Sequence, residues 1–274
     1  MSEIIGKRNI KTLTELQALA FHQKEEKKQI SLSFSYTVTH TPRAVMDILN
    51  SAWEIEGAQE NLNCEMKSRM EILREAREWE CVDGCNGEWL SCAREILHNN
   101  GVPMGVFSEA VTDLLTKGRG KYRNIMIVGT ANCGKTFVLN PLTEMYHTFC
   151  NPTSGSFNAW IGVESGECIF LNDFRWPPQV IPWHDLLLLL KGHIVHVAAP
   201  KTHFAKDTTF TADTPIFCTR KHPLLYIKNG VVDECQTEMM TVRWQIFHFN
   251  YQIPRERQRE IPLCSRCLSE LIIG

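Results

Sequence analysis

The chain has 274 residues, of which 43% are hydrophobic and 22% are charged, so it can hold one large soluble domain or a core domain with a smaller attachment. Its formal net charge of −2 excludes a general electrostatic attraction to nucleic acid, so any such binding requires a local basic patch. No stretch approaches the roughly 20 apolar residues that span a bilayer, and Met1–Lys11 lack the apolar run of a secretory signal. We therefore expect an intracellular protein, in the nucleus or the cytoplasm, without a membrane partner.

The first 118 residues are predicted to be mainly helical. The exception is Ile30–Thr39, where apolar and hydroxyl residues alternate with period two. This pattern indicates a half-buried strand. Thr41 and Pro42 then favour the start of a helix, as its N-cap and its first helical residue. Helical patterns predict this helix and three more, at Ala44–Trp53, Gln59–Glu80, Trp89–Leu97 and Val106–Leu115. Gly118 closes the last of them.

From Tyr122 onward the composition changes to short apolar segments. Such segments are typical of strands in a sheet that is buried on both faces. The expected strands are Ile125–Val128, Cys168–Leu171, His193–Val197, Pro215–Cys218 and Val242–Tyr251. Helices are expected after Lys135 and after Trp183, where a run of five leucines follows. We therefore predict an α/β fold with a central, mostly parallel sheet over residues 119–255, followed by a short tail at 256–274.

The segment that follows the first of these strands fits the pattern of a phosphate-binding loop. It consists of Gly129, Thr130, Ala131, Asn132, Cys133, Gly134, Lys135 and Thr136. The two glycines permit backbone angles that let several N–H groups converge on phosphate oxygens. Lys135 supplies a cation to the outer phosphates, the Thr136 hydroxyl can bind Mg²⁺, and the next helix directs its positive end at the anion. The strand, loop and helix together predict a site for ATP and Mg²⁺ rather than a chance glycine-rich turn.

A second element of such a site, an acidic residue at the end of a neighbouring strand, is expected to hold the metal. The apolar strand Cys168–Leu171 supplies it, because Asn172 and Asp173 follow directly. An Asp after an apolar run is often only the end of a strand. Its position downstream of a phosphate loop makes Asp173 the candidate ligand of Mg²⁺ and the candidate partner of the attacking water.

The order of these motifs resembles that of superfamily 3 helicases. The phosphate loop, the strand that ends at Asn172–Trp176, and the stretch from Lys191–Val197 to Thr214–Thr219 occur in the order and spacing of that family. Its members are AAA+-type motors of small DNA virus replication proteins, and this chain resembles parvovirus and circovirus-like initiators over about Asn100–Tyr251. The resemblance implies a P-loop, AAA+-like ATP-dependent helicase or translocase. It also implies a homo-oligomeric ring that assembles through a helical amino-terminal collar and acts on single-stranded or forked DNA. If the chain is viral, the implied location is the host nucleus.

The same resemblance implies roles for residues outside the loop. Lys201, His203 and Lys206 lie in the segment that resembles the DNA-contacting hairpin, although an ordinary solvated loop has the same composition. Arg243 resembles the arginine finger that reaches a neighbouring subunit's nucleotide, and the alternative is a surface arginine on a strand.

Two departures from the family pattern bear on catalysis. The sensor strand of the family ends in Asn, whereas here Arg220 and Lys221 follow Thr219, and Lys221 would stabilise γ-phosphate charge instead. Family members usually carry two adjacent acids after the acidic strand, whereas this chain has Asn172 before Asp173. ATP binding is therefore a firmer expectation than rapid hydrolysis. The alternative function is a catalytically weakened nucleotide-binding regulator or assembly scaffold. The His-x-His motif of viral nicking domains is absent from the sequence.

The eleven cysteines raise the question of a metal site. In a reducing compartment they are expected to be free thiols or metal ligands rather than disulfides. Cys264 and Cys267 have the spacing of a zinc knuckle, which needs two more ligands, and His248 is one candidate. Cys81 and Cys85, with Cys92 and Cys64, could form another half or whole site. Because isolated pairs are a weak signal, free thiols are the main expectation and structural zinc is the alternative.

Overall fold

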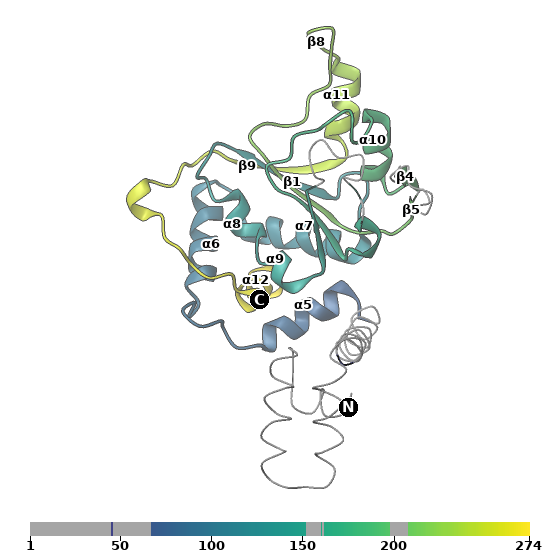
Figure 1. Cartoon of the computed structure of the whole chain (residues 1–274). Coiled ribbons are helices and arrows are strands. Elements are labelled where there is room, and N and C mark those ends of the chain that lie inside the picture. The colour runs from purple at the N-terminus through teal and green to yellow at the C-terminus, as the bar shows by residue number, and fades with distance from the viewer. Residues whose placement is uncertain (1–44, 46–66, 152–159, 161, 198–207) are drawn as a thin grey trace. The chain divides into compact units, whose positions relative to one another are not determined.

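The computed structural model describes residues 45, 67–151, 160, 162–197 and 208–274 (Figure 1). The chain divides into two compact units, Met1–Lys67 and Ser68–Gly274, and all the described residues except Val45 and Lys67 lie in the second. The strand predicted at 30–39 lies outside the described residues. So does the helix predicted at 44–53, except for Val45, which is helical.

The second unit is built on a sheet of five parallel strands. In space the strands follow the order β2-β3-β6-β1-β9. Their bounds are β1 Asn124–Gly129, β2 Thr148–Cys150, β3 Cys168–Leu171, β6 Ile216–Arg220 and β9 Trp244–Phe249. Because all five strands run the same way, their carboxyl ends meet at one edge of the sheet. The α/β fold and parallel sheet predicted from the apolar strands are confirmed.

Side-chain alternation along these strands divides the core into two layers. In β1, Ile125 and Ile127 face one apolar cluster, whereas Met126 and Val128 face the other. The first cluster is covered by α5 (Arg69–Glu78), α6 (Glu88–Asn99), α7 (Met104–Lys117), α9 (Leu142–Met145) and α12 (Ser265–Ile273). The second is covered mainly by α10 (Trp183–Lys191), with Met240 of α11 (Glu234–Thr241). In Figure 1, α7, α9 and α12 lie below the sheet, and α10 and α11 lie above it.

Local sequence signals set the ends of several helices. Ser68 and Glu71 form a reciprocal capping box at the start of α5, which satisfies backbone N–H groups that the helix leaves unpaired. Gly118 ends α7 with a positive φ, and a Cβ there would lie 1.9 Å from the carbonyl oxygen of Asp213. Gly192 ends α10 in the left-handed conformation. The stop at Gly118 matches the predicted end of α7.

The domain boundary expected at residues 118–122 is corrected by the structure. Helices α5 to α7 pack in the same cluster as the β1 side chains Ile125 and Ile127, so they belong to the unit that carries the sheet. The division falls after Lys67 instead. The expected tail at 256–274 also joins this core, because α12 buries Leu268, Leu271 and Ile272 there. Composition marks where strands begin, but it does not show which helices share their core.

Two small antiparallel pairs complete the described part. β4 (Val195–Val197) pairs with β5 (Thr208–Phe210), and β7 (Ile227–Lys228) pairs with β8 (Val231–Val232). Of these four, only β4 was expected. No helix among the described residues has both the length and the hydropathy needed to cross a membrane.

Candidate functional site

The predicted phosphate loop connects β1 to the short helix α8 (Lys135–Leu139) at the carboxyl edge of the sheet. Both of its glycines are required by their surroundings. A Cβ on Gly129 would lie 2.0 Å from the carbonyl oxygen of Phe249 on the neighbouring strand. Gly134 has φ +84°, and a Cβ there would meet the Ile96 side chain of α6 at 2.8 Å. The loop is therefore held closely between β9 and α6.

Lys135 is buried, with its ammonium group turned into the loop. Its Nζ donates to the carbonyl oxygens of Gly129 at 3.0 Å and of Thr130 at 2.6 Å. The Cys133 thiol also donates to the Thr130 carbonyl, at 3.0 Å. Neutral carbonyls are weaker partners for an ammonium group than a phosphate oxygen is, so a bound phosphate can replace them. This geometry fits the role expected for Lys135.

Asn172 is the hub of the hydrogen bonds beside the loop. Its Oδ1 accepts from the Thr136 hydroxyl at 2.8 Å and from the Thr219 hydroxyl at 2.7 Å. The Thr219 hydroxyl in turn accepts from the backbone N–H of Asp173 at 2.8 Å. The loop, the end of β3 and the end of β6 are thus connected through one amide. The sequence pattern marked Asn172 only as a departure from the paired acids of the family. It could not assign a role to Thr219, because it does not show that β6 lies between β1 and β3.

Asp173 is the second residue after β3, and its exposed side chain lines the cavity above the loop. Its φ is +46°, a left-handed conformation that is uncommon for a residue other than glycine and is often found at functional sites. The structure therefore brings Asp173 to the same cavity as Lys135 and Thr136, as expected for a metal-binding acid.

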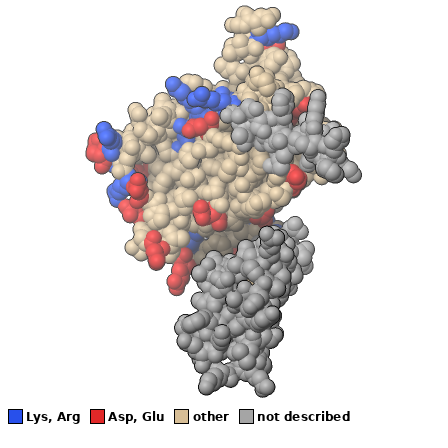
Figure 2. Space-filling model, in the orientation of Figure 1, with Lys and Arg blue, Asp and Glu red and all other residues tan. Residues whose placement is uncertain are grey.

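A cavity of about 650 Å³ joins the elements of the site. It is lined by Gly129, Ala131, Asn132, Cys133, Gly134, Lys135, Thr136, Phe137, Asp173, Phe174, Arg175, Arg220, Lys221 and His222. Four of these side chains are Lys or Arg and one is Asp, so the cavity favours a polyanion. Figure 2 shows the largest group of basic side chains on the visible face above the sheet.

Arg220 is a further candidate that the sequence pattern did not select, because the pattern pointed to its neighbour Lys221. Burial lowers the pKa of the Arg220 guanidinium, and its Nη1 is buried without a hydrogen-bond partner among the described residues. Lys221 also lines the cavity, with an exposed side chain. A half-buried cation with a free donor is better placed than an exposed lysine to bind a phosphate strongly.

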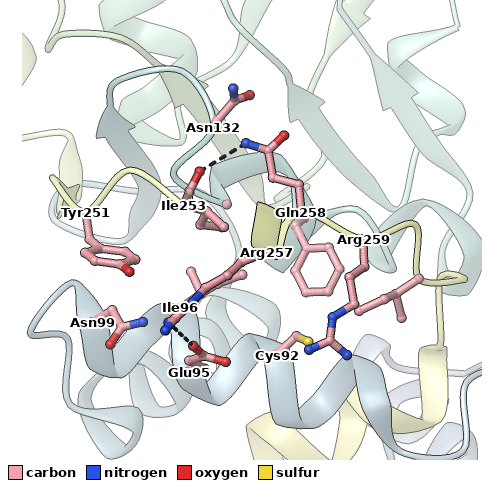
Figure 3. A pocket seen from close by; sticks show the side chains of 13 residues that line it. Cys92, Glu95, Ile96, Asn99, Asn132, Tyr251, Ile253, Arg257, Gln258 and Arg259 are labelled. Atoms are coloured by element: carbon pink, nitrogen blue, oxygen red, sulfur yellow. Dashed lines mark hydrogen bonds and ion pairs between the residues drawn. The ribbon is translucent and has the colours of Figure 1, made fainter. Parts of the chain in front are cut away.

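A second cavity of about 540 Å³ adjoins the loop from the other side (Figure 3). Asn132, Gly134 and Phe137 line both cavities. One wall is α6, and the other is the segment after β9 that runs from Tyr251 to Ile261. The lining mixes apolar and polar side chains and includes Ile96, Asn99, Tyr251, Ile253, Gln258 and Ile261.

The segment after β9 is fixed to both the loop and α6. The backbone N–H of Ile253 donates to the carbonyl oxygen of Asn132 at 2.8 Å. Arg257 forms an ion pair with Glu95 at 3.6 Å, and Gln258 donates to the Ile253 carbonyl at 3.0 Å. The second cavity is therefore attached directly to the phosphate loop.

Arg243 does not have the geometry expected of an arginine finger. It precedes β9 at the amino edge of the sheet, opposite the loop, and only 9% of its surface is exposed. Its guanidinium donates to the carbonyl oxygens of Leu187 and Met239 within the same chain. Because these carbonyls already occupy it, we reassign Arg243 from a trans-acting residue to one that holds α10 and α11 against the sheet.

The three residues expected to contact DNA, Lys201, His203 and Lys206, lie outside the described residues. The flanking strands β4 and β5 pair antiparallel, with His196 opposite Thr209.

No protein-family model and no curated protein matches the sequence. Among solved structures, the chain is similar to the apo C-terminal region of NrS-1, with 12% identity and a TM-score of 0.44 over 72% of this chain and 45% of that one. It is also similar to JCV helicase crystallised with a small molecule, with 11% identity and a TM-score of 0.49 over 82% of this chain and 65% of that one. The chain thus spans less than two thirds of either structure. These similarities concern the fold alone.

Proposed function

We propose that this chain binds MgATP and hydrolyses it as the motor of a DNA helicase or translocase. The observation that carries the proposal is the single cavity in which the phosphate loop meets Asp173, Arg220 and Lys221. A triphosphate needs backbone donors, a lysine and a metal ligand within reach of one another, and residues from three neighbouring strand ends supply them.

In this proposal the two adjoining cavities divide the nucleotide between them. The phosphates occupy the basic cavity, with Lys135 and Arg220 on the outer phosphates. The base and ribose occupy the second cavity, where Phe137 and Ile253 offer apolar surface and Asn99 and Gln258 offer polar groups. The shared residues Asn132 and Gly134 lie at the junction.

The metal would be held by the Thr136 hydroxyl and the Asp173 carboxylate. The hydrogen bond from Thr136 to Asn172 fixes the hydroxyl proton, so its lone pairs remain available to the cavity. A neutral amide at position 172 attracts Mg²⁺ less than a carboxylate would. We therefore expect slow turnover, with Asp173 orienting the attacking water.

The Asn172 amide also favours the second candidate, a regulator or scaffold that binds nucleotide without turnover. The two candidates share the nucleotide site and differ in the chemical step. They are separated by whether bound ATP is converted to ADP.

The test is ATP turnover by the wild type, Lys135→Ala and Asn172→Asp, measured over a series of Mg²⁺ concentrations. The motor proposal expects turnover that Lys135→Ala abolishes, and half-maximal activity of Asn172→Asp at a lower Mg²⁺ concentration. Lys121→Ala, an exposed lysine away from the cavity, serves as the matched control. Binding without turnover in the wild type would support the regulator, and no nucleotide binding would reject both.

We also propose that DNA contacts the chain between β4 and β5, through Lys201, Lys206 and His203. Lysines on a hairpin can follow a phosphate backbone even when the whole chain is nearly neutral. The double variant Lys201→Ala, Lys206→Ala is expected to weaken binding of single-stranded and forked DNA and to reduce its salt dependence, while nucleotide binding stays unchanged. Equal DNA affinity and salt dependence in the variant and the wild type would contradict this assignment.

A homo-oligomeric ring is the assembly that this proposal implies. The mass of the particle in solution, with and without a non-hydrolysable ATP analogue and DNA, measures it directly. A particle that stays monomeric under all four conditions would remove the ring from the proposal.

A further inference from the structure

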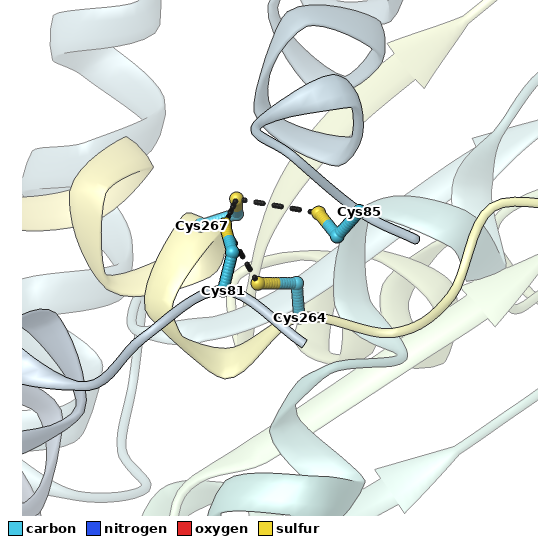
Figure 4. A group of neighbouring side chains, drawn as sticks. All are labelled: Cys81, Cys85, Cys264 and Cys267. Atoms are coloured by element: carbon cyan, nitrogen blue, oxygen red, sulfur yellow. Dashed lines mark hydrogen bonds between the residues drawn. The ribbon is translucent and has the colours of Figure 1, made fainter. Parts of the chain in front are cut away.

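Four cysteines from opposite ends of the second unit meet in one buried cluster (Figure 4). Cys81 and Cys85 lie in the turn between α5 and α6, whereas Cys264 and Cys267 lie at the start of α12. Their sulfur atoms all lie within 4.8 Å of one another. Cys85, Cys264 and Cys267 are fully buried, and Cys81 is half-buried. The fold thus joins two cysteine pairs that are separated by 178 residues, from Cys85 to Cys264.

The separations match those of four thiolates around a single metal ion. Three sulfur–sulfur distances are 3.5 Å from Cys81 to Cys267, 3.6 Å from Cys85 to Cys267 and 3.7 Å from Cys264 to Cys81. A tetrahedral zinc ion with Zn–S bonds of about 2.3 Å places its ligand sulfurs about 3.8 Å apart. An iron–sulfur cluster inserts several irons and sulfides between its cysteines, so it requires a wider spread than this.

The backbone around the cluster is shaped to present the sulfurs inward. Gly84, Asn86 and Gly87 all have positive φ, so the chain turns tightly around Cys85.

A basic side chain lies next to the cluster. The Arg266 guanidinium contacts the sulfur of Cys81, with Nη1 3.8 Å from Sγ. Four thiolates around Zn²⁺ carry a net charge of −2, so a neighbouring arginine offsets part of that charge. A cluster of neutral thiols offers no such attraction.

We propose that Cys81, Cys85, Cys264 and Cys267 form a structural zinc site. Four protein ligands leave no open coordination position, so the site is structural rather than catalytic. It fastens the amino end of α6 to the amino end of α12. This inference revises the expectation of free thiols, and it uses two pairs whose partners the sequence alone could not identify.

The zinc site also connects to the cavity beside the phosphate loop. α6, one wall of the second cavity, begins at Glu88, three residues after Cys85. The opposite wall ends at Ile261, three residues before Cys264. The zinc site therefore holds one end of each wall of the second cavity in place. That this cavity binds part of the nucleotide rests on the proposed function.

The test begins with the metal content of the full chain, purified under reducing conditions without chelators. Elemental analysis and native mass spectrometry are expected to find one zinc ion per chain. Replacing zinc by Co²⁺ is expected to give the visible absorption of a tetrahedral site and the near-ultraviolet thiolate-to-cobalt charge transfer. Both readouts use the wild type, so they do not depend on whether a variant folds.

Variants then identify the ligands. Cys85→Ser and Cys267→Ser are expected to lose the metal and to lower the unfolding temperature, whereas Cys235→Ser, an exposed cysteine on α11, should retain it. Iron instead of zinc, disulfides between these cysteines, no metal in the wild type, or equal zinc in Cys267→Ser and Cys235→Ser would each overturn the proposal. Zinc binding without nucleotide binding would leave the site intact and reject the proposed function alone.

Discussion

Asn172 is a neutral residue at the centre of the hydrogen bonds beside the phosphate loop. It accepts hydrogen bonds from Thr136 and Thr219, so it orders the hydroxyl that would face the metal. An amide does this as well as a carboxylate, because the oxygen of either group can accept two hydrogen bonds. It lacks the negative charge that would hold Mg²⁺. The residue therefore preserves the geometry of the site and weakens its electrostatics, which is why turnover and binding are separate questions for this chain.

At the scale of single residues, the sequence could predict those whose roles depend on local pattern. Lys135, Thr136 and Asp173 were identified from a loop and from the end of a strand, and all three line the cavity. Thr219 and Arg220 could not be found in this way, because their roles depend on the pairing of β6 beside β1. Arg243 was selected by its position in the chain, and burial among backbone carbonyls gives it another task.

Gly129→Ala is expected to destabilise the fold by about 1–3 kcal/mol, because the new Cβ would overlap the backbone of β9 at Phe249 rather than a movable side chain. Chemical denaturation without nucleotide measures the change. Gly105→Ala is the matched control. Gly105 lies in α7 with open space around it, so alanine there is expected to be neutral or stabilising by up to about 1 kcal/mol. Equal stability of Gly129→Ala and the wild type would show that β9 does not approach the loop so closely.

At the scale of elements, the apolar strands were predicted well and the peripheral ones poorly. Buried strands such as β1 and β3 are continuous apolar runs, which a sequence reveals directly. β2 is only three residues long and partly exposed, so its sequence shows no clear alternation of apolar and polar residues. Helix α12 follows a proline-containing segment and was expected as a tail, because its packing against α5 and α7 is not visible in its own sequence.

One ion pair ties α5 to the segment before β6. Arg69 binds Asp213 through two hydrogen bonds of 3.0 Å, and the Arg69 side chain also donates to the Leu115 carbonyl. The hydrogen bonds from Arg69 lower the pKa of the Asp213 carboxyl below its ordinary value of 3.8. The Asp213 side chain is 63% exposed, so solvent screening limits the contribution of the pair to about 1 kcal/mol or less.

Asp213→Asn is therefore expected to lower stability slightly at neutral pH, and the difference should disappear in acid. A depressed pKa means that the folded state favours the charged carboxylate. The added stability is complete above the pKa that Asp213 has in the unfolded chain. It is lost as the pH falls through the lower pKa that Asp213 has in the folded protein. Denaturant unfolding of both proteins over a pH series measures this, with Glu109→Gln on α7 as the control. A difference that grows below pH 3.8 would contradict the assignment.

At the scale of the whole molecule, the second cavity depends on segments far apart in the chain. Its walls come from α6 and from residues after β9, and the four-cysteine cluster lies where both segments begin or end. No local pattern predicts such a meeting, because it follows from the packing of α12 in the helical layer. The sequence did indicate both cysteine pairs, and the fold shows that they form one cluster.

The central claim is that MgATP binds at the phosphate loop. Calorimetric titration of the wild type and Lys135→Ala with a non-hydrolysable ATP analogue and Mg²⁺ tests it most directly. We predict binding of one nucleotide per chain to the wild type, at least about tenfold weaker binding to Lys135→Ala because a charged phosphate partner is lost, and unchanged binding to Lys121→Ala. No binding to the wild type, or equal affinity in Lys135→Ala, would contradict the account.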